Sequence, residues 1–265
     1  MSNQVIHYKD FAISLAKRAG EEIRKNFVLG MDREIKKDGS PVTKTDLAIN
    51  KMVVEEVQKN FPGHAVIGEE ESHSITDAEY SWVCDPVDGT IPFSHGMPTC
   101  AFSLALTRNG KPILGVAYDA FMDRMVVAEE GKGAFLNGEK IQVSTHKNLE
   151  GAYISHCIWR HMQYSLLGFY DDMVFNSKAE NFAVGSIVYN AILLAAGQID
   201  GIVFAHHTAH DVAAIKIIVE EAGGKVTDFW GNDQRYDQPV KGCLISNGLI
   251  HEELLKLVQK HLKVV

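Results

Sequence analysis

The feature that most constrains this chain is a buried-strand pattern that ends directly in two carboxylates. The apolar run 82–84 (Trp-Val-Cys) is typical of an internal strand, and Asp85 and Asp88 follow it on either side of Pro86. Proline fixes one backbone angle, so the turn is stiff before any ligand binds. The spacing lets both carboxylates and the Val87 carbonyl face one point. Oxygen ligands crowded at a strand end favour a hard cation such as Mg²⁺.

The two residues after this turn favour an anion. The amides of Gly89 and Thr90 lie where backbone nests and helix starts hold phosphate groups. Cation and anion sites side by side indicate phosphate chemistry. An Asp-Pro-x-Asp-Gly surface turn is the plainer interpretation, because these residues are all common in turns.

Three further segments contain acidic residues that the fold can bring close to this turn. The apolar run 66–68 also ends in carboxylates, Glu69 and Glu70, while Asp46 and Asp211 each begin a helical pattern. Each has a plainer interpretation as well. Runs such as Glu69 and its neighbours are mostly solvated, and acids at helix starts are commonly caps.

In this order and spacing, the segments resemble the inositol monophosphatase family, the Mg²⁺-dependent, lithium-sensitive phosphatases related to fructose-1,6-bisphosphatase. The resemblance covers nearly the whole chain and implies an α/β (α+β) fold, the layered α-β-α-β-α sandwich. The residues that carry it are Gly68-Glu69-Glu70, the run 85–90, Gly96-x-Pro98, Gly185-Ser186 and the Asp211 helix that ends Glu221-Ala222-Gly223-Gly224.

Hydrophobic periodicity predicts mixed α/β structure independently of the resemblance. Apolar residues at every fourth position from Phe11 to Phe27 predict a first helix. The other expected elements are helix 46–60, strands within 101–136 with hairpin turns at 109–110 and 137–138, helix 186–196, strand 201–204, helix 211–222, strands 225–227 and 243–246, and helix 249–261. The alternation after residue 150 is typical of an α/β layer. We expect a single domain, 1–265, with lobes of approximately 1–150 and 151–265 and the metal site between them.

Composition limits the classes of binding partner and the cellular compartment that we expect for this protein. A formal net charge of −8 argues against a nucleic-acid partner, and no apolar run reaches membrane-spanning length. Residues 1–4 show no signal pattern, and the 4 cysteines fit no zinc or redox motif. We therefore expect a cytoplasmic protein with reduced cysteines. The resemblance adds a small phosphate ester as substrate and a homodimer as the assembly.

The resemblance also implies a set of metal ligands. Glu69, Asp85 and the Val87 carbonyl hold one Mg²⁺, while Asp85, Asp88 and Asp211 hold a second. A third, weaker ion lies near Glu69, which makes two to three ions in all. Without cations, this many neighbouring carboxylates raise one another's pKa values.

The implied chemistry is hydrolysis by a metal-activated water. Thr90 and Asp46 form a hydroxyl–carboxylate pair that orients or deprotonates the water, and Glu69 assists. The amides of Gly89 and Thr90 bind phosphate oxygens. Lys36 matches the family's lysine near the third ion, with a solvated surface charge as the alternative.

Several positions depart from the family's pattern and concern the substrate. Phe204 stands where inositol-selective relatives carry glutamate, and His210 stands where tryptophan is common. Pro92 replaces a polar or basic residue, and Ile187 replaces an alanine. Because Phe204 cannot accept a hydrogen bond from a sugar hydroxyl, we expect poor hydrolysis of inositol 1-phosphate. The expected substrate contacts are Gly185, Ser186, Phe204, His207 and His210, with weaker candidates in His206, Arg160 and His161.

Other functions stay open on the sequence alone. Related families act on histidinol phosphate, fructose 1,6-bisphosphate or adenosine 3′,5′-bisphosphate. A non-catalytic sensor of metal or phosphate is a second class, and a Ca²⁺-stabilised structural protein is a third. The presence of both Asp46 and Thr90 argues against a sensor, because a sensor does not need to activate water.

Overall fold

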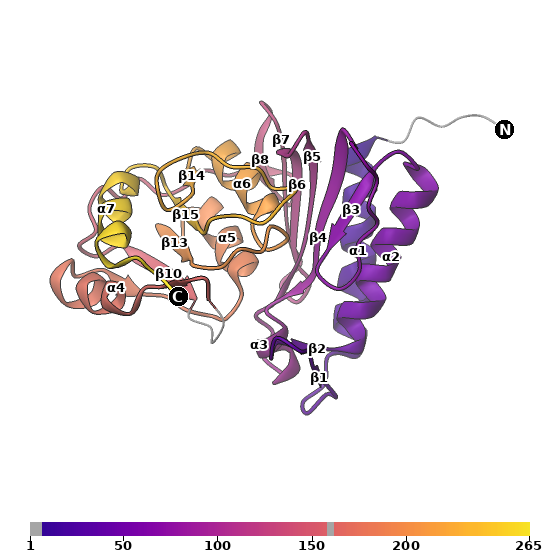
Figure 1. Ribbon diagram of the computed structural model, residues 1–265, viewed down its shortest axis with the longest axis horizontal. Helices are drawn as coiled ribbons and strands as arrows, with labels where there is room; N and C mark the ends of the chain where they lie inside the picture. Colours follow the sequence, from indigo (N-terminus) through magenta and orange to yellow (C-terminus); the bar gives the residue numbers. More distant parts are fainter. Residues whose placement is uncertain (1–6, 158–161) are drawn as a thin grey trace.

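The largest element of the fold is a seven-stranded sheet with the order β3-β4-β5-β6-β7-β8-β9. The computed structural model describes residues 7–157 and 162–265 (Figure 1). Strands β3 and β4 are parallel to each other, and the remaining pairs of this sheet are antiparallel. The strands are β3 (Ala65–Gly68), β4 (Tyr80–Asp88), β5 (Ala101–Arg108), β6 (Lys111–Asp119), β7 (Arg124–Glu129), β8 (Gly133–Leu136) and β9 (Glu139–Lys140).

Two long helices, α1 (Tyr8–Asn26) and α2 (Lys44–Asn60), lie side by side on one face of this sheet (Figure 1). Helix α1 buries the predicted stripe, including Phe11, Leu15 and Ile23, in one cluster with strand residues such as Trp82. The chain between the two helices forms a small hairpin of β1 (Glu34–Ile35) and β2 (Pro41–Val42). The short helix α3 (Thr90–Ser94) follows β4 directly.

The other face of the sheet is covered by α5 (Ile187–Ala195) and α6 (Ala213–Glu221) (Figure 1). Helix α6 approaches strand β6 closely at Gly115, where an added Cβ would lie 2.9 Å from the Ala214 carbonyl oxygen. This close approach brings the start of α6 next to the large sheet. It therefore sets where Asp211, two residues before the helix, can lie.

A second, five-stranded sheet lies beyond these helices, with the order β12-β10-β13-β15-β14. Its strands are β10 (Tyr153–Cys157), β12 (Glu180–Asn181), β13 (Gly201–Phe204), β14 (Lys225–Thr227) and β15 (Cys243–Ser246). The outer layer contains α4 (Leu167–Asp171), the π-helix η1 (Asp172–Asn176) and α7 (His251–His261), with β11 (Tyr164–Ser165) paired to β16 (Lys263–Val264). In Figure 1 the layers follow one another as helix, sheet, helix, sheet and helix. The predicted α-β-α-β-α sandwich is confirmed.

The middle core joins the two predicted lobes. Its buried cluster combines Val83 and Ala105 of the large sheet with Ile187, Val212 and Ile245 from the later part of the chain. The boundary near residue 150 stays a prediction. Across the described ranges, no helix is both long and apolar enough to span a bilayer.

The predicted elements differ from the observed ones mainly at their ends. Helix α2 begins at Lys44, two residues before the predicted start, because Thr43 caps it. Helix α6 begins at Ala213, so Asp211 precedes the helix. Strand β4 continues through Asp88, with a register shift between Asp85 and Asp88. The shift lets both acids belong to one strand and still face the same site.

Candidate active site

The ends of β3 and β4 bring Glu69 and Asp85 together. The two strands pair in parallel, with Gly68 opposite Cys84, and the Glu69 amide donates to the Cys84 carbonyl at 3.2 Å. The loop after β3 is held by Asn50 of α2, whose side chain donates to the Glu71 carbonyl and accepts from the Glu70 amide. A Cβ at position 68 would lie 2.3 Å from Asn50, so glycine is required there. Asn50 was not predicted, because no local pattern marks it.

Asp85, Asp88 and Asp211 form the centre of the site. One carboxylate oxygen from each lies within 4.8 Å of the others. Asp85 and Asp88 are buried, with 2% and 5% of their surface exposed. Burial raises the pKa of Asp85 well above its usual range, and the charges of Glu69, Asp88 and Asp211 raise it further. Burial and the Asp211 charge also raise the pKa of Asp88.

This donor set fits a hard divalent cation. Several oxygen ligands converge on one small volume, and their mutual repulsion is the interaction that a cation relieves. The Val87 carbonyl oxygen lies 3.1 Å from Thr90 Oγ1, so it already faces this side of the turn. A second acidic group, Asp46, Glu69 and Glu70, also has oxygens within 4.8 Å of one another.

Ser186 holds Asp88 from the opposite side of the site. Its hydroxyl donates to Asp88 Oδ2, and the Val188 amide donates to the same oxygen at 2.7 Å. Ser186 is also the N-cap of α5 and accepts from the Tyr189 amide at 3.0 Å. The side chain is fully buried, so it orients a carboxylate instead of offering the predicted surface to a substrate. Gly185, just before it, has a φ of +81°.

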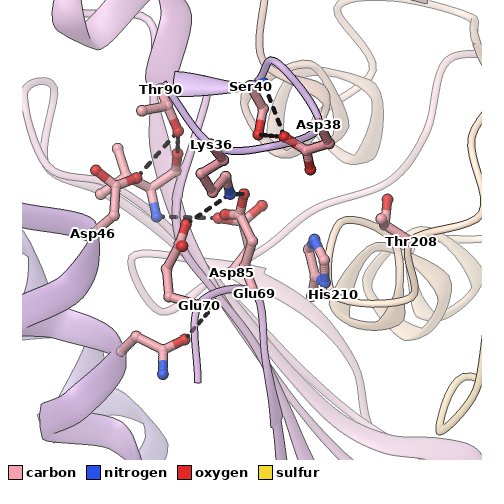
Figure 2. Close-up of polar contacts among 12 residues, drawn as sticks. Lys36, Asp38, Ser40, Asp46, Glu69, Glu70, Asp85, Thr90, Thr208 and His210 are labelled. Carbon is pink, nitrogen blue, oxygen red and sulfur yellow. Dashed lines mark hydrogen bonds and ion pairs between the residues drawn. The ribbon is translucent and has the colours of Figure 1, made fainter. Parts of the chain in front are cut away.

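Thr90 and Asp46 form a hydrogen-bonded pair on the side of α2 (Figure 2). Thr90 Oγ1 lies 3.1 Å from Asp46 Oδ1 and the same distance from the Val87 carbonyl oxygen. The other oxygen of Asp46 accepts from the Thr43 amide at 2.9 Å, which completes a capping box. Asp46 is thus both a helix cap and the partner of Thr90. Burial raises its pKa.

Gly89 joins the carboxylates of β4 to α3 at a position that has no room for a side chain. Its φ of +89° lies in the left-handed region, and a Cβ there would lie 2.8 Å from the Ser186 side chain. Gly89 also occupies the N-cap of α3, with Thr90 as the first helical residue. Phosphate binding by the two amides stays a prediction.

Lys36 pairs with the acidic loop. Its Nζ lies 2.8 Å from Glu69 Oε1 and 3.0 Å from Glu70 Oε1. Burial alone would lower the pKa of Lys36, but the carboxylates of Glu69 and Glu70 raise it overall. Lys36 is therefore part of the site's charge balance, and the alternative of a solvated surface charge does not hold.

The loop before α6 contributes Asp211, Thr208 and His210. The Thr208 hydroxyl donates to Asp211 Oδ2, a contact that was not predicted. His210 Nε2 lies 3.7 Å from the same oxygen, and His210 forms a third candidate group with Glu69 and Asp85. His207 is exposed and stacks on His206, with ring centroids 4.5 Å apart.

Phe204 lies in a different place from the one expected. The ring is fully buried and belongs to the middle core, with its backbone paired to Cys157 and Cys243. It has no exposed surface to offer as the wall of a substrate pocket. The expected penalty on inositol 1-phosphate therefore loses its structural basis. Arg160 and His161 lie outside the described residues.

A groove of about 560 Å³ runs along β3 and reaches the site at Thr208 and His210. The lining residues are 65–67, 72–75, 77, 78 and 81 from the earlier part of the chain, and 207–210, 235 and 237–239 from the later part. The buried carboxylates Asp85 and Asp88 do not line it. The groove therefore approaches the site from the side of the histidine loop.

The profile of the inositol monophosphatase family matches residues 6–263 of this chain. A fructose-1,6-bisphosphatase/inositol-1-monophosphatase of Thermotoga maritima is 36% identical over 254 residues, which is 95% of each chain. Inositol monophosphatase 2 of Solanum lycopersicum is 34% identical over 237 residues, which covers 85% of this chain and 89% of the relative.

Solved structures agree with the sequence relatives. The structure of a Thermotoga maritima IMPase superposes with a TM-score of 0.85 at 35% identity and covers 95% of this chain and 96% of the other. At this identity and coverage, the likeness extends over both sheets and the helices between them. The resemblance drawn from the acidic motifs is confirmed.

Proposed function

Since this chain belongs to the inositol monophosphatase family and is a phosphoric monoester hydrolase, we propose that its carboxylate centre binds Mg²⁺ for the hydrolysis of a small polyol phosphate. The observation that carries the proposal is the convergence of Asp85, Asp88 and Asp211 beside the Thr90–Asp46 pair. A metal-binding sensor explains the carboxylates, but it does not explain the hydrogen bond between the half-buried Thr90 hydroxyl and the buried Asp46 next to them.

The proposed metal ligands are Glu69, Asp85, the Val87 carbonyl, Asp88 and Asp211, which together hold two to three ions. Bound divalent ions activate water and stabilise the charge that develops on the leaving oxygen. Ser186 and Thr208 orient the ligands, because each donates a hydrogen bond to one carboxylate oxygen. Lys36 balances the charge of Glu69 at the edge of the site.

The Thr90–Asp46 pair handles the proton in this proposal. Asp46 Oδ1 and the Val87 carbonyl oxygen both lie 3.1 Å from Thr90 Oγ1. In the proposed arrangement the single hydroxyl proton points to Asp46, which leaves the Thr90 oxygen free to accept a hydrogen bond from a water. As the water attacks phosphorus, its proton moves to the Thr90 oxygen while the hydroxyl proton moves to Asp46. Burial raises the pKa of Asp46, which makes it a better proton acceptor than an exposed aspartate.

Inositol 1-phosphate is the first substrate to test. The relatives carry the name inositol monophosphatase, and the buried position of Phe204 removes the expected obstacle. Histidinol phosphate and adenosine 3′,5′-bisphosphate are not favoured. Fructose 1,6-bisphosphate belongs in the panel because the Thermotoga maritima relative is also named a fructose-1,6-bisphosphatase.

Three further properties belong to the proposal. Mg²⁺ is the expected ion, and Li⁺ is expected to inhibit by taking one of its positions. The assembly is expected to be a homodimer, which light scattering of the purified chain tests. The expected compartment is the cytoplasm, which fractionation of cells tests.

The experiment measures phosphate release from the substrate panel with and without Mg²⁺. We expect inositol 1-phosphate to be hydrolysed only when Mg²⁺ is present. Asp119 provides a matched control for substitutions of the site, because it is a buried aspartate at the end of β6 outside the three candidate metal groups. Hydrolysis that persists in excess chelator would contradict the proposal.

A further inference from the structure

One nitrogen donor lies within reach of the carboxylate centre. A ring nitrogen of His210 and single carboxylate oxygens of Glu69 and Asp85 all lie within 4.8 Å of one another. In Figure 2 the imidazole of His210 lies on the side of Glu69 and Asp85 that is away from Thr90 and Asp46. The histidine therefore adds to the centre without occupying the place of the proposed proton acceptor.

The choice of residue at this position matters chemically. An indole N–H or an amide N–H at this position could only donate a hydrogen bond. Imidazole has a lone pair and is the commonest nitrogen ligand of metals in proteins. His210 thus places a nitrogen donor beside the carboxylates of Glu69 and Asp85.

A mixed nitrogen and oxygen set favours different ions from an all-oxygen set. Mg²⁺ prefers oxygen ligands in octahedral geometry, whereas imidazole suits Zn²⁺, Co²⁺ and neighbouring ions. A tetrahedral zinc ion holds its ligand atoms about 3.4 Å apart, so donors within 4.8 Å of one another need to approach by at most about 1.4 Å. Half-buried side chains can make this adjustment: 19% of Glu69 and 16% of His210 are exposed.

The ion can also reach this side of the centre. His210 and Thr208 line the groove of about 560 Å³ that runs along β3. The proposed Mg²⁺ ligands Asp85 and Asp88 lie outside that lining. His210 is thus the one proposed zinc ligand that lines the groove, whereas Glu69 and Asp85 lie outside the lining.

We propose that His210, together with Glu69 and Asp85, binds a late first-row divalent cation such as Zn²⁺. His210 is the ligand that makes this group of three prefer such an ion to Mg²⁺. The proposal rests on the proposed function, because two of the three ligands are proposed Mg²⁺ ligands. It goes beyond that function by assigning a ligand and an ion class that the all-oxygen set does not supply.

Calorimetric titration of the metal-free enzyme with Zn²⁺ and, separately, with Mg²⁺ tests the proposal. The variants are His210→Gln and His210→Trp, and the control is His73→Gln, because His73 is a half-buried histidine that lines the same groove. We expect both His210 variants to lose at least about 10–100-fold in Zn²⁺ affinity, because that is the range for losing an outer-shell partner and His210 is proposed as a direct ligand. Their Mg²⁺ affinity and the control's affinities stay at the wild-type values.

A Co²⁺ absorption spectrum gives a second measurement that does not depend on turnover. The wild-type spectrum is expected to show nitrogen ligation, and the His210 variants are expected to lose that signature. Equal Zn²⁺ affinity in wild type and variants, or an equal loss for Zn²⁺ and Mg²⁺, overturns the proposal. Lack of Mg²⁺-dependent phosphatase activity in the wild type contradicts the proposed function instead, and a His210-dependent Zn²⁺ site then still stands.

Discussion

The two sides of the carboxylate centre are built in different ways. The side formed by β4 and α2 is backbone-anchored: Asp85 and Asp88 belong to a sheet strand, and Asp46 caps a helix. The opposite side is the loop 205–211 before α6, where Thr208 and His210 are half-buried and His207 is exposed. In the proposed function the strand side supplies most of the metal ligands and the proton path, and in the proposed zinc site His210 of the loop side sets the ion preference. Substitutions on the two sides are therefore expected to have different consequences.

The largest effect is expected from Asp85→Asn. Asp85 belongs to both the group with Asp88 and Asp211 and the group with Glu69 and His210, so its loss disturbs every proposed ion at the strand end. We expect phosphate release from inositol 1-phosphate to fall below detection at saturating Mg²⁺. The control Asp119→Asn removes a buried charge elsewhere and is expected to keep its activity. Wild-type-like turnover by Asp85→Asn would contradict the assignment of Asp85 as a metal ligand.

Thr90→Ala is expected to lower kcat by about 10²–10⁴-fold, the usual contribution of acid–base assistance. Mg²⁺ affinity should remain, because the proposed role of the hydroxyl is in the proton path to Asp46. Thr90→Ser keeps the hydroxyl and is expected to recover most of the activity. Calorimetry that showed lost Mg²⁺ binding in Thr90→Ala would make the residue a structural support.

Ser186→Ala separates the orientation of a ligand from catalysis. Without the hydroxyl, Asp88 keeps only the hydrogen bond from the Val188 amide, so we expect Mg²⁺ affinity to fall about 10–100-fold. Excess Mg²⁺ should restore much of the turnover. Ser94→Ala is the control, because that buried hydroxyl donates to the Ile91 carbonyl of its own short helix. An unchanged Mg²⁺ affinity in Ser186→Ala would show that the amide is sufficient.

The smallest effect is expected from Phe204→Leu, which tests whether the residue contacts a substrate at all. A core ring replaced by leucine costs about 1.5 kcal/mol of stability. Because Phe204 is fully buried, kcat/KM for inositol 1-phosphate relative to the other panel members should not change. A changed ratio would indicate that Phe204 contacts the substrate.

Much of the strand side follows from local sequence. An apolar run followed by acids predicts both β3 and β4, and parallel neighbours necessarily end at the same edge, which joins Glu69 to Asp85. The pairing of Asp46 with Thr90 came from the family resemblance, since 44 residues separate them and no local pattern links them. Family motifs identify residues that are far apart in the sequence but close in the fold, and hydrophobic periodicity cannot do this.

Contacts that depend on packing between distant segments were not predictable. Ser186 reaches Asp88 across 98 residues of chain, and its burial turns an expected substrate contact into a support for a ligand. Phe204 is buried because its side chain packs in the middle core, with residues from both sheets and the helices between them. Strand β10 was missed because Ser155 and His156 interrupt its apolar pattern.

The central claim is that buried carboxylates are held together against their own repulsion and that a divalent cation relieves it. Burial raises the pKa of Glu69 in the folded chain, although His210 and Lys36 oppose the rise. Burial and neighbouring carboxylates raise the pKa values of Asp85 and Asp88, that of Asp88 to about 8. Acids with a raised folded pKa hold more protons when folded, so the free energy of unfolding falls as pH rises from about 4 towards 8.

The melting temperature of the metal-free enzyme, measured from pH 5 to pH 8 with and without Mg²⁺, tests this claim most directly. We expect the metal-free melting temperature to fall with rising pH and the stabilisation by Mg²⁺ to grow, reaching about 2.7 kcal/mol when Mg²⁺ is present at 100 times its Kd. Asp85→Asn should flatten the metal-free curve. A metal-free curve that does not fall with pH, together with no stabilisation by Mg²⁺ at pH 8, would contradict the account.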